Sequence, residues 1–430
     1  MKRLTARLLH ASLLMLLAAP AAAQDPPRLT LQQAEQIALQ NHPLIQASQY
    51  GALAAHEIVR EARAPYFPSA FGSITGAEAE TGSRIAAGGL NNPIIYDRFA
   101  AGVSVGQLLT DFGRTHALVQ SFSLNAQAQD AGVVSRRADV LLDVDRAYFN
   151  VLRAQAVQRV AQDTVRARQL VVDQVSALAA SNLKSSLDVS FAKVNLSEAQ
   201  LLLAQAQGDV QGSLADLATA LGGVQLPAYT LAEEPLPQAL PADSAPLVVE
   251  ALRDRPEIAA ERFNAQAAMK LADAEHDLFL PSIAAVGSFG VTPYHQAGIN
   301  DRYAAVGVNV NIPLTNGNLF AARHAEALFK AQAESQRVRD VENRVSRDVQ
   351  VAWLNASTAF QRLGLTDQLL DQATQALDLA QQRYNLGLSS IVELSQAQLN
   401  KTQAELAQAS AKYEYQAQRA TLRYQIGALR

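Results

Sequence analysis

The chain has 430 residues, a formal net charge of −4 and no cysteine. It therefore cannot form disulfides or carry a lipid on a cysteine, and stability must come from packing or assembly. The small net charge and the absence of blocks of like charge argue against a nucleic-acid partner.

Residues 1–23 are predicted to be a secretory signal peptide. Lys2, Arg3 and Arg7 precede the apolar run LLHASLLMLLAAP, and small residues lie just before Gln24. The sequence after residue 23 has no apolar run of about 18 residues, the length that indicates a membrane-spanning helix. Any membrane contact is therefore expected to involve strands.

The remaining chain is predicted to contain two tandem copies of one unit. Residues 38–55 align with residues 251–268 without gaps, and DVDRAYFN aligns with DVQVAWLN further along. The offset between the copies falls by eight residues between Ser69 and Val103, where TGSRIAAGGLNNP is interpreted as a surface loop. The predicted domains are a first repeat at 24–226, a proline-rich linker at 227–246 and a second repeat at 247–430.

Each copy is predicted to begin with a helix, continue with two strands and end with a long helical hairpin. All prolines lie outside the windows 94–226 and 314–430, which are rich in helix formers with coiled-coil spacing. A helix of about 70 residues would be about 100 Å long and would need neighbours along its whole length. The predicted strand hairpins are 67–110 and 281–313, and the predicted helical hairpins are 111–222 and 316–427.

Alternating apolar and small polar residues predict the strands. The residues assigned to the membrane strands are Val103, Val105, Val306, Val308, Val310 and Ile312. Four strands cannot close a barrel, because the smallest bacterial barrels have about eight, so several chains would share one. A small soluble sheet is the alternative. Tyr303 and Phe99, near the strand starts, are interpreted either as an aromatic girdle at the membrane boundary or as packing of such a sheet.

Two turns, 181–185 and 385–390, are predicted to connect the long helices. Asn182, Gly387 and Ser389 are assigned to them, and Gly387 is expected to end its helix in a left-handed conformation. Ser390 with Glu393, and Ser185 with Asp188, fit the capping box, in which Ser caps the helix and the acid bonds back to the Ser amide. Capping can be the whole role of these acids, or they can also charge a channel mouth in a threefold assembly.

Catalytic motifs are absent from the sequence. The seven His residues include no H-x-x-x-H pair, and there is neither a phosphate-binding G-x-x-x-x-G-K-S/T loop nor a G-x-S-x-G nucleophile motif. The protein is therefore expected not to be an enzyme and to have no cofactor or metal.

The two-copy order and several motifs resemble the TolC-like outer-membrane efflux proteins. The motifs are LQNHPLI and ALRDRPEI at the helix starts, LLTDFGR and PLTNGN between strand and helix, and the turn YNLGLSSIVEL. The resemblance implies an α+β membrane protein, whose homotrimer forms a 12-stranded barrel of four strands per protomer and a periplasmic α-barrel of long coiled-coil helices. It also implies a passive exit duct for tripartite efflux or type I secretion, in contact with outer-membrane lipid, a periplasmic adaptor (membrane fusion protein) and an inner-membrane pump.

Asp188, Tyr384 and Glu393 match family positions at the periplasmic aperture. Two positions depart from the family: Ser389 stands where an Arg is common, and Gln396 where a second acid is common. The aperture charge is thus reduced, and a particular gating network cannot be transferred. A periplasmic coiled-coil scaffold protein with a soluble sheet is the alternative function.

Overall fold

The structure is a computed structural model that describes residues 28–78, 80, 97–223, 229–237, 239–295, 298 and 300–429. The predicted signal peptide, the predicted loop at 81–93 and parts of the predicted linker lie outside the described residues.

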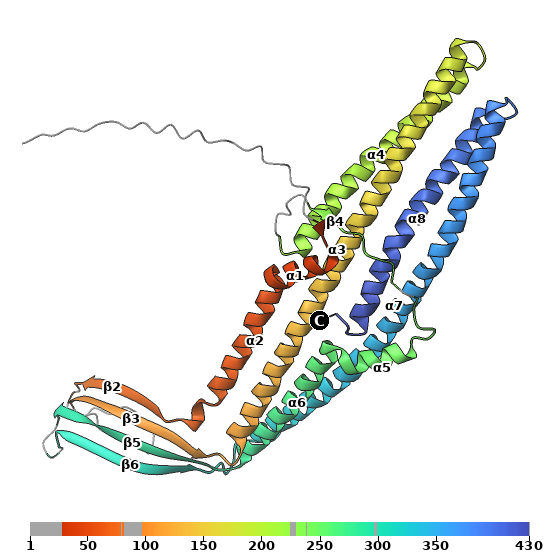
Figure 1. Ribbon diagram of the computed structural model, residues 1–430. Helices are drawn as coiled ribbons and strands as arrows, with labels where there is room; N and C mark the ends of the chain where they lie inside the picture. The colour runs from red at the N-terminus through yellow and green to blue at the C-terminus, as the bar shows by residue number, and fades with distance from the viewer. Residues whose placement is uncertain are drawn as a thin grey trace, which may run out of the picture.

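The chain is elongated, with a four-stranded sheet at one end and two long helical hairpins at the other (Figure 1). Each repeat contributes two shorter helices, two strands and one hairpin. The elements of the first repeat are α1 (Leu31–Asn41), α2 (Pro43–Ala62), β2 (Ser69–Ala77), β3 (Arg98–Thr110), α3 (Arg114–Ala180) and α4 (Ser186–Ala220). Those of the second are α5 (Ala245–Asp254), α6 (Pro256–His276), β5 (Ser282–Tyr294), β6 (Arg302–Asn311), α7 (Leu319–Asn385) and α8 (Ile391–Gln425).

Short elements complete the fold. Strands β1 (Arg28–Leu29) and β4 (Thr230–Leu231) pair in parallel, and the 3-10 turns η1 (Ala64–Tyr66) and η2 (Asp277–Phe279) precede β2 and β5. In the described part of the chain, no helix combines the length and the apolar character needed to cross a bilayer.

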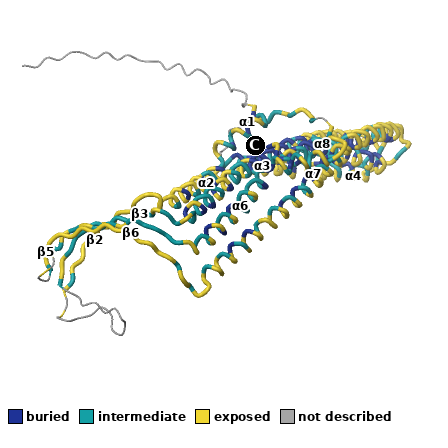
Figure 2. Tube along the Cα trace, turned by 90° about the horizontal axis from the view of Figure 1, so that it is seen from below, coloured by how far each residue is buried: buried dark blue, intermediate teal, exposed yellow. Residues whose placement is uncertain are grey.

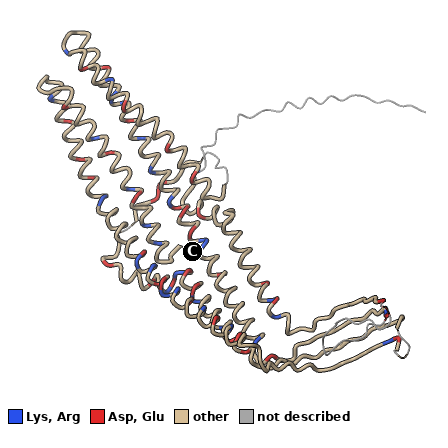
Figure 3. The backbone as a smooth tube through the Cα atoms, turned by 180° about the vertical axis from the view of Figure 1, so that it is seen from behind, with Lys and Arg blue, Asp and Glu red and all other residues tan. Residues whose placement is uncertain are grey.

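The sheet has the antiparallel order β2-β3-β5-β6, so β2 and β6 are its edges. Its register aligns Val105 with Gly287 and Gly287 with Val306, and the residues of each such row share a face of the sheet. The apolar face carries Ile74, Phe99, Val103, Val105, Phe289, Val306, Val308 and Val310. The other, more polar face carries Ser69, Ser73, Thr75, Ser104, Ser288, Asn309 and Asn311, together with Phe71, Val286 and Tyr303. Charged residues follow the helices and the far strand ends, and the middle of the sheet has none (Figure 3).

One prediction about the strands is corrected. Ile312 lies directly after β6, which ends at Asn311, because Pro313 has no N–H to extend the ladder. Tyr303 is on the polar face and Phe99 on the apolar face, so the two rings do not share one face of the sheet.

The sequence predicts one helix before the strands of each repeat, whereas the structure has two. The breaks fall at His42 and Arg255, each followed by a proline at the first helical position. The ends of α4 and α8 abut these breaks. There Gly222 (φ 96°) and Gly427 (φ 79°) have the left-handed conformation that favours glycine, and a Cβ on Gly222 would lie 3.0 Å from the Asn41 carbonyl oxygen.

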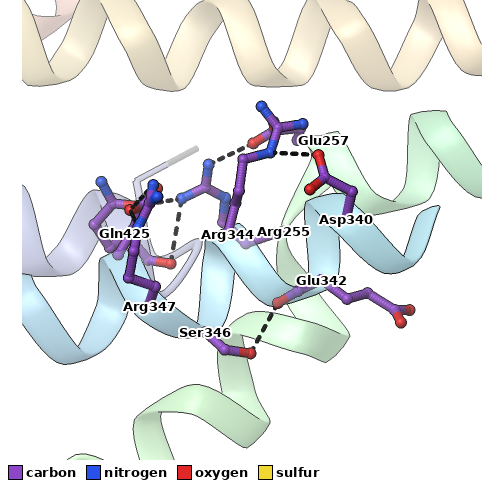
Figure 4. Close-up of polar contacts among 9 residues, drawn as sticks. Arg255, Glu257, Asp340, Glu342, Arg344, Ser346, Arg347 and Gln425 are labelled. Carbon is purple, nitrogen blue, oxygen red and sulfur yellow. Dashed lines mark hydrogen bonds and ion pairs between the residues drawn. The ribbon is translucent and has the colours of Figure 1, made fainter. Parts of the chain in front are cut away.

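Arg255 connects the second break to the end of α8. Its guanidinium donates to Gln425 Oε1 at 2.6 Å and to Glu257 Oε2 at 2.7 Å (Figure 4). It also lies over the Tyr424 ring. The side chain is almost fully buried, and such a cation is tolerated because hydrogen bonds satisfy it. The α5–α6 junction is thereby fixed against α8.

Buried residues concentrate along the middle of the helices, while the sheet is mostly exposed (Figure 2). The largest core cluster joins α1, α3, α4 and α8 and includes Val144, Tyr148, Leu217 and Tyr413. The Tyr148 hydroxyl lies 2.8 Å from the Leu29 carbonyl oxygen and 2.7 Å from that of Ala232, so it holds the β1–β4 pair on α3.

Candidate functional site at the hairpin ends

The turn between α3 and α4 has a capped geometry. Asn182 has a φ of 54°, and the Leu183 N–H donates to the Leu178 carbonyl at 2.9 Å. Ser185 Oγ accepts from the Asp188 N–H at 3.2 Å, and Asp188 Oδ2 accepts from the Ser185 N–H at 3.0 Å. Both halves of the capping box predicted at Ser185 are therefore present, and the negative charge of Asp188 lies at the positive end of the α4 dipole.

The turn between α7 and α8 differs in its acid. Gly387 has a φ of 73°, and the Leu388 N–H donates to the Arg383 carbonyl at 2.8 Å. Ser390 Oγ accepts from the Glu393 N–H at 3.4 Å, which is one half of a capping box. The Glu393 carboxylate instead pairs with Arg383, with Oε1 3.1 Å from Nε. The capping box predicted at Ser390 is thus incomplete, and the Arg383–Glu393 ion pair links the end of α7 to the start of α8.

Tyr384 lies between the two hairpins. It is 5% exposed and packs with Val171, Val172, Val175, Ala192, Ile391 and Leu394. Lys184 Nζ lies 4.1 Å from the centroid of its ring, a distance that allows a cation–π contact. Burial, and then the charge of Asp188, raise the pKa of the Tyr384 hydroxyl. Tyr384 and Asp188 are therefore brought together, and Tyr384 connects the hairpins within one protomer.

Gln396 and Ser389 add no charge to the site. Gln396 is exposed and its Nε2 donates to Asn400 Oδ1 at 2.9 Å on the same helix. The Ser389 Oγ is buried, without a hydrogen-bond partner among the described residues. The hairpins are bridged close by, where Asn195 Nδ2 donates to Ser395 Oγ at 2.7 Å.

Two residues of the site were missed by the sequence analysis. Arg383 could have been found, because its position in the last turn of α7 places it directly across the turn from Glu393 in the first turn of α8. Lys184 has no such local signal, because its contact with Tyr384 depends on how the two hairpins pack.

Comparisons with known proteins agree with this architecture. The family described as "Outer membrane efflux protein" matches residues 35–223 and 247–428. Outer membrane protein TolC of Escherichia coli is 22% identical over 93% of this chain and 82% of its own length, and protein CyaE of Bordetella pertussis is 28% identical over 86% and 78%. The crystal structure of the outer membrane protein VceC from Vibrio cholerae covers 92% of this chain and 96% of its own, with a TM-score of 0.77 and 19% identity.

An open sheet with one apolar face, continued by coiled-coil hairpins, defines an outer-membrane channel protein that extends into the periplasm. The chain belongs to the outer membrane efflux protein family. It is therefore an efflux channel protein, as the resemblance implied.

Proposed function

We propose that three copies of the chain assemble into one duct, with a shared 12-stranded barrel in the outer membrane and a helical tunnel in the periplasm. The four-stranded sheet has two free edges, β2 and β6, and edges of this kind pair when a barrel closes. Its apolar face would contact outer-membrane lipid, in line with the 94% exposure of Val306, and its Ser, Thr and Asn face would line the lumen.

The repeat supplies the observation that carries this proposal. Helix α6 lies between α3 and α7 and contacts both, whereas its equivalent α2 lies against α3 at one edge of the molecule (Figure 1). Ala267 of α6 is 1% exposed and receives a hydrogen bond from Ser121 of α3 at its carbonyl oxygen. The equivalent residues, Ala54 on α2 and Glu326 on α7, are both exposed. A second protomer would bring its α7 against α2 and complete the pattern.

Crosslinking tests this contact, and the absence of cysteine makes the background clean. In the variant Ala54→Cys/Glu326→Cys, a short bifunctional thiol reagent should join protomers and give covalent trimers on denaturing gels. The matched pair Ser121→Cys/Ala267→Cys should crosslink within a protomer and leave the monomer mass unchanged. Monomers only from the first pair, with efficient reaction of the second, would contradict the trimer.

The periplasmic mouth would be charged by Asp188 and Glu393 of every protomer. Recurring carboxylates around one axis attract cations and repel anions. Asp188 accepts hydrogen bonds from the neutral N–H and hydroxyl of Ser185. Arg383 offsets part of the Glu393 charge, so Asp188 would make the larger contribution. The variant Asp188→Asn/Glu393→Gln should therefore lower cation preference and divalent-cation block in planar bilayers. Asp163→Asn, an exposed acid further down α3, is the control. If the double variant keeps the wild-type selectivity and block, these acids do not line the mouth.

The hairpin ends are the proposed docking place for a periplasmic adaptor and, through it, an inner-membrane pump. Leu183, Leu187, Leu386 and Leu388 are exposed there. The duct itself would be passive, and substrate choice would lie with the pump. In support, the names of two relatives refer to different cargo: cobalt-zinc-cadmium resistance for CzcC and pyoverdine export for OpmQ. The variant Leu183→Asp/Leu388→Asp should still form trimers but should no longer co-purify with the adaptor.

A further inference from the structure

Tyr303 lies across three strands on the polar face of the sheet. The register places it opposite Gly290 of β5, and Gly290 opposite Gly102 of β3. A Cβ on Gly102 would meet the Tyr303 hydroxyl first and would lie 2.9 Å from the Phe289 carbonyl oxygen. A Cβ on Gly290 would lie 2.6 Å from Tyr303 Cζ and Oη, and closer still to the Ala101 carbonyl oxygen. Because such approaches are too short for non-bonded atoms, the phenol ring can lie over both positions only while they are glycine.

Other glycines of the sheet do not have this role. A Cβ on Gly106 would come no closer than 3.6 Å to Ser69 Oγ, and one on Gly307 no closer than 3.9 Å to Val286 Cγ2. Both are on the same polar face as Tyr303. Close approach of the Tyr303 ring and of a backbone carbonyl oxygen therefore explains Gly102 and Gly290, whereas an added methyl group at Gly106 or Gly307 would meet ordinary contacts.

The position of the Tyr303 ring affects the width of the proposed duct. In the duct described under "Proposed function", on which this inference rests, the polar face lines the lumen. Tyr303 is one residue into β6 from its far end, away from the helices that begin after Asn311. It is 39% exposed, so part of the ring borders open space on that face. A ring that lies flat on the wall occupies little of the lumen, and the same ring turned upright would narrow it.

We propose that Gly102 and Gly290 hold the Tyr303 ring flat against the channel wall, and that Tyr303 thereby sets the free width of the outer part of the duct. One such ring from each protomer would line that level of the lumen. Replacing either glycine by alanine displaces the ring toward the lumen, because the added Cβ would overlap the phenol; at position 290 it would also meet the Ala101 carbonyl oxygen.

Single-channel conductance in planar bilayers tests the proposal. Gly102→Ala and Gly290→Ala should both have a lower conductance than wild type, whereas the matched control Gly307→Ala, which adds the same methyl group on the same face, should not. Gly102→Ala/Tyr303→Ala should restore conductance to at least the wild-type value, because the atom nearest to the Cβ at position 102 is the Tyr303 hydroxyl oxygen. Equal conductances of Gly102→Ala and Gly307→Ala, or a deficit that persists in the double variant, would overturn the proposal.

Orientation is tested without disturbing the glycines. Tyr303→Cys should react with a water-soluble thiosulfonate added to the open channel and lose conductance on modification, while Val306→Cys on the apolar face should not react in the membrane. An unreactive Cys at position 303 would overturn the inference even if Gly290→Ala fails to assemble. A wild-type protein that forms no channels would instead defeat the duct itself.

Discussion

Replacing Asp145 with Asn tests whether a buried carboxyl in the middle of the helices is neutral. Asp145 lies on α3 and is 0% exposed. Burial, and then the charge of Glu35 on α1, raise its pKa to about 8, while Arg423 on α8 acts in the opposite direction. It borders a cavity of about 220 Å³ that is also lined by Glu234, Gln416 and Arg419.

The pKa sets the size and the sign of the effect. An unfolded Asp titrates near 3.8, so between that pH and about 8 the folded protein holds a proton that the unfolded chain has lost. The free energy of unfolding therefore falls by about 1.4 kcal/mol per pH unit across this window, or about 3 kcal/mol between pH 5 and pH 7. Below pH 3.8 both states are protonated, and above about pH 8 both are ionised, so the free energy of unfolding falls no further. Asn has no titrating proton, so the Asp145→Asn variant should lack this dependence of the free energy of unfolding on pH.

The assay is guanidinium unfolding of the detergent-solubilised protein at pH 5 and pH 7. The stability of Asp145→Asn relative to wild type should rise by about 3 kcal/mol from the lower to the higher pH. Asp143→Asn, an exposed acid on the same helix, should follow the wild-type profile. Parallel pH profiles for wild type and Asp145→Asn would show that the carboxyl is ionised in the fold and refute the reasoning.

Three further substitutions test local structure. Tyr148→Phe leaves the carbonyls of Leu29 and Ala232 without the hydroxyl and should cost about 1–3 kcal/mol, with faster hydrogen exchange at β1 and β4; unchanged exchange would contradict it. Gly387→Ala should lower the free energy of unfolding by about 1 kcal/mol, because Gly387 has a left-handed conformation, whereas Gly364→Ala inside α7 should raise it by about 0.5–1 kcal/mol. Denaturant unfolding that shifted the stability of both variants in the same direction would contradict the left-handed conformation at Gly387. Ser185→Ala should cost about 1 kcal/mol and speed exchange in the first turn of α4 more than Ser390→Ala does in α8, since only the first capping box is complete; equal effects would argue against that difference.

The sequence was sufficient for the fold class because the decisive signals are local. Period-two alternation in β6 and the proline-free heptads of α3 and α8 each depend on residues close together in the chain. The break at His42 was missed although Pro43 follows it, because proline at a first helical position also fits the start of a single longer helix.

The hairpin ends show what local patterns miss. The S-x-x-E pattern at Ser390 predicts a complete capping box, but Arg383 across the turn offers Glu393 a full charge and not a backbone amide. Tyr384 was assigned to the aperture by resemblance, while its burial depends on the packing of one hairpin against the other. The Arg383–Glu393 pair is local and could have been found from the sequence. The burial of Tyr384 depends on contacts between hairpins far apart in sequence, so no local pattern could reveal it.

Small residues on exposed helix faces indicate where the proposed trimer closes. Ala117 and Ala128 of α3 are buried, whereas their repeat equivalents on α7, Ala322 and Ala333, are exposed. A helix face that stays in water gains nothing from alanine beyond its helix propensity, and long charged side chains are common there. Alanine retained at both copies of a contact position is better explained by close packing at both. In the proposed trimer, Ala322 and Ala333 would then lie at a contact between protomers, and the cysteine pair at positions 54 and 326 tests whether this part of α7 meets the next protomer.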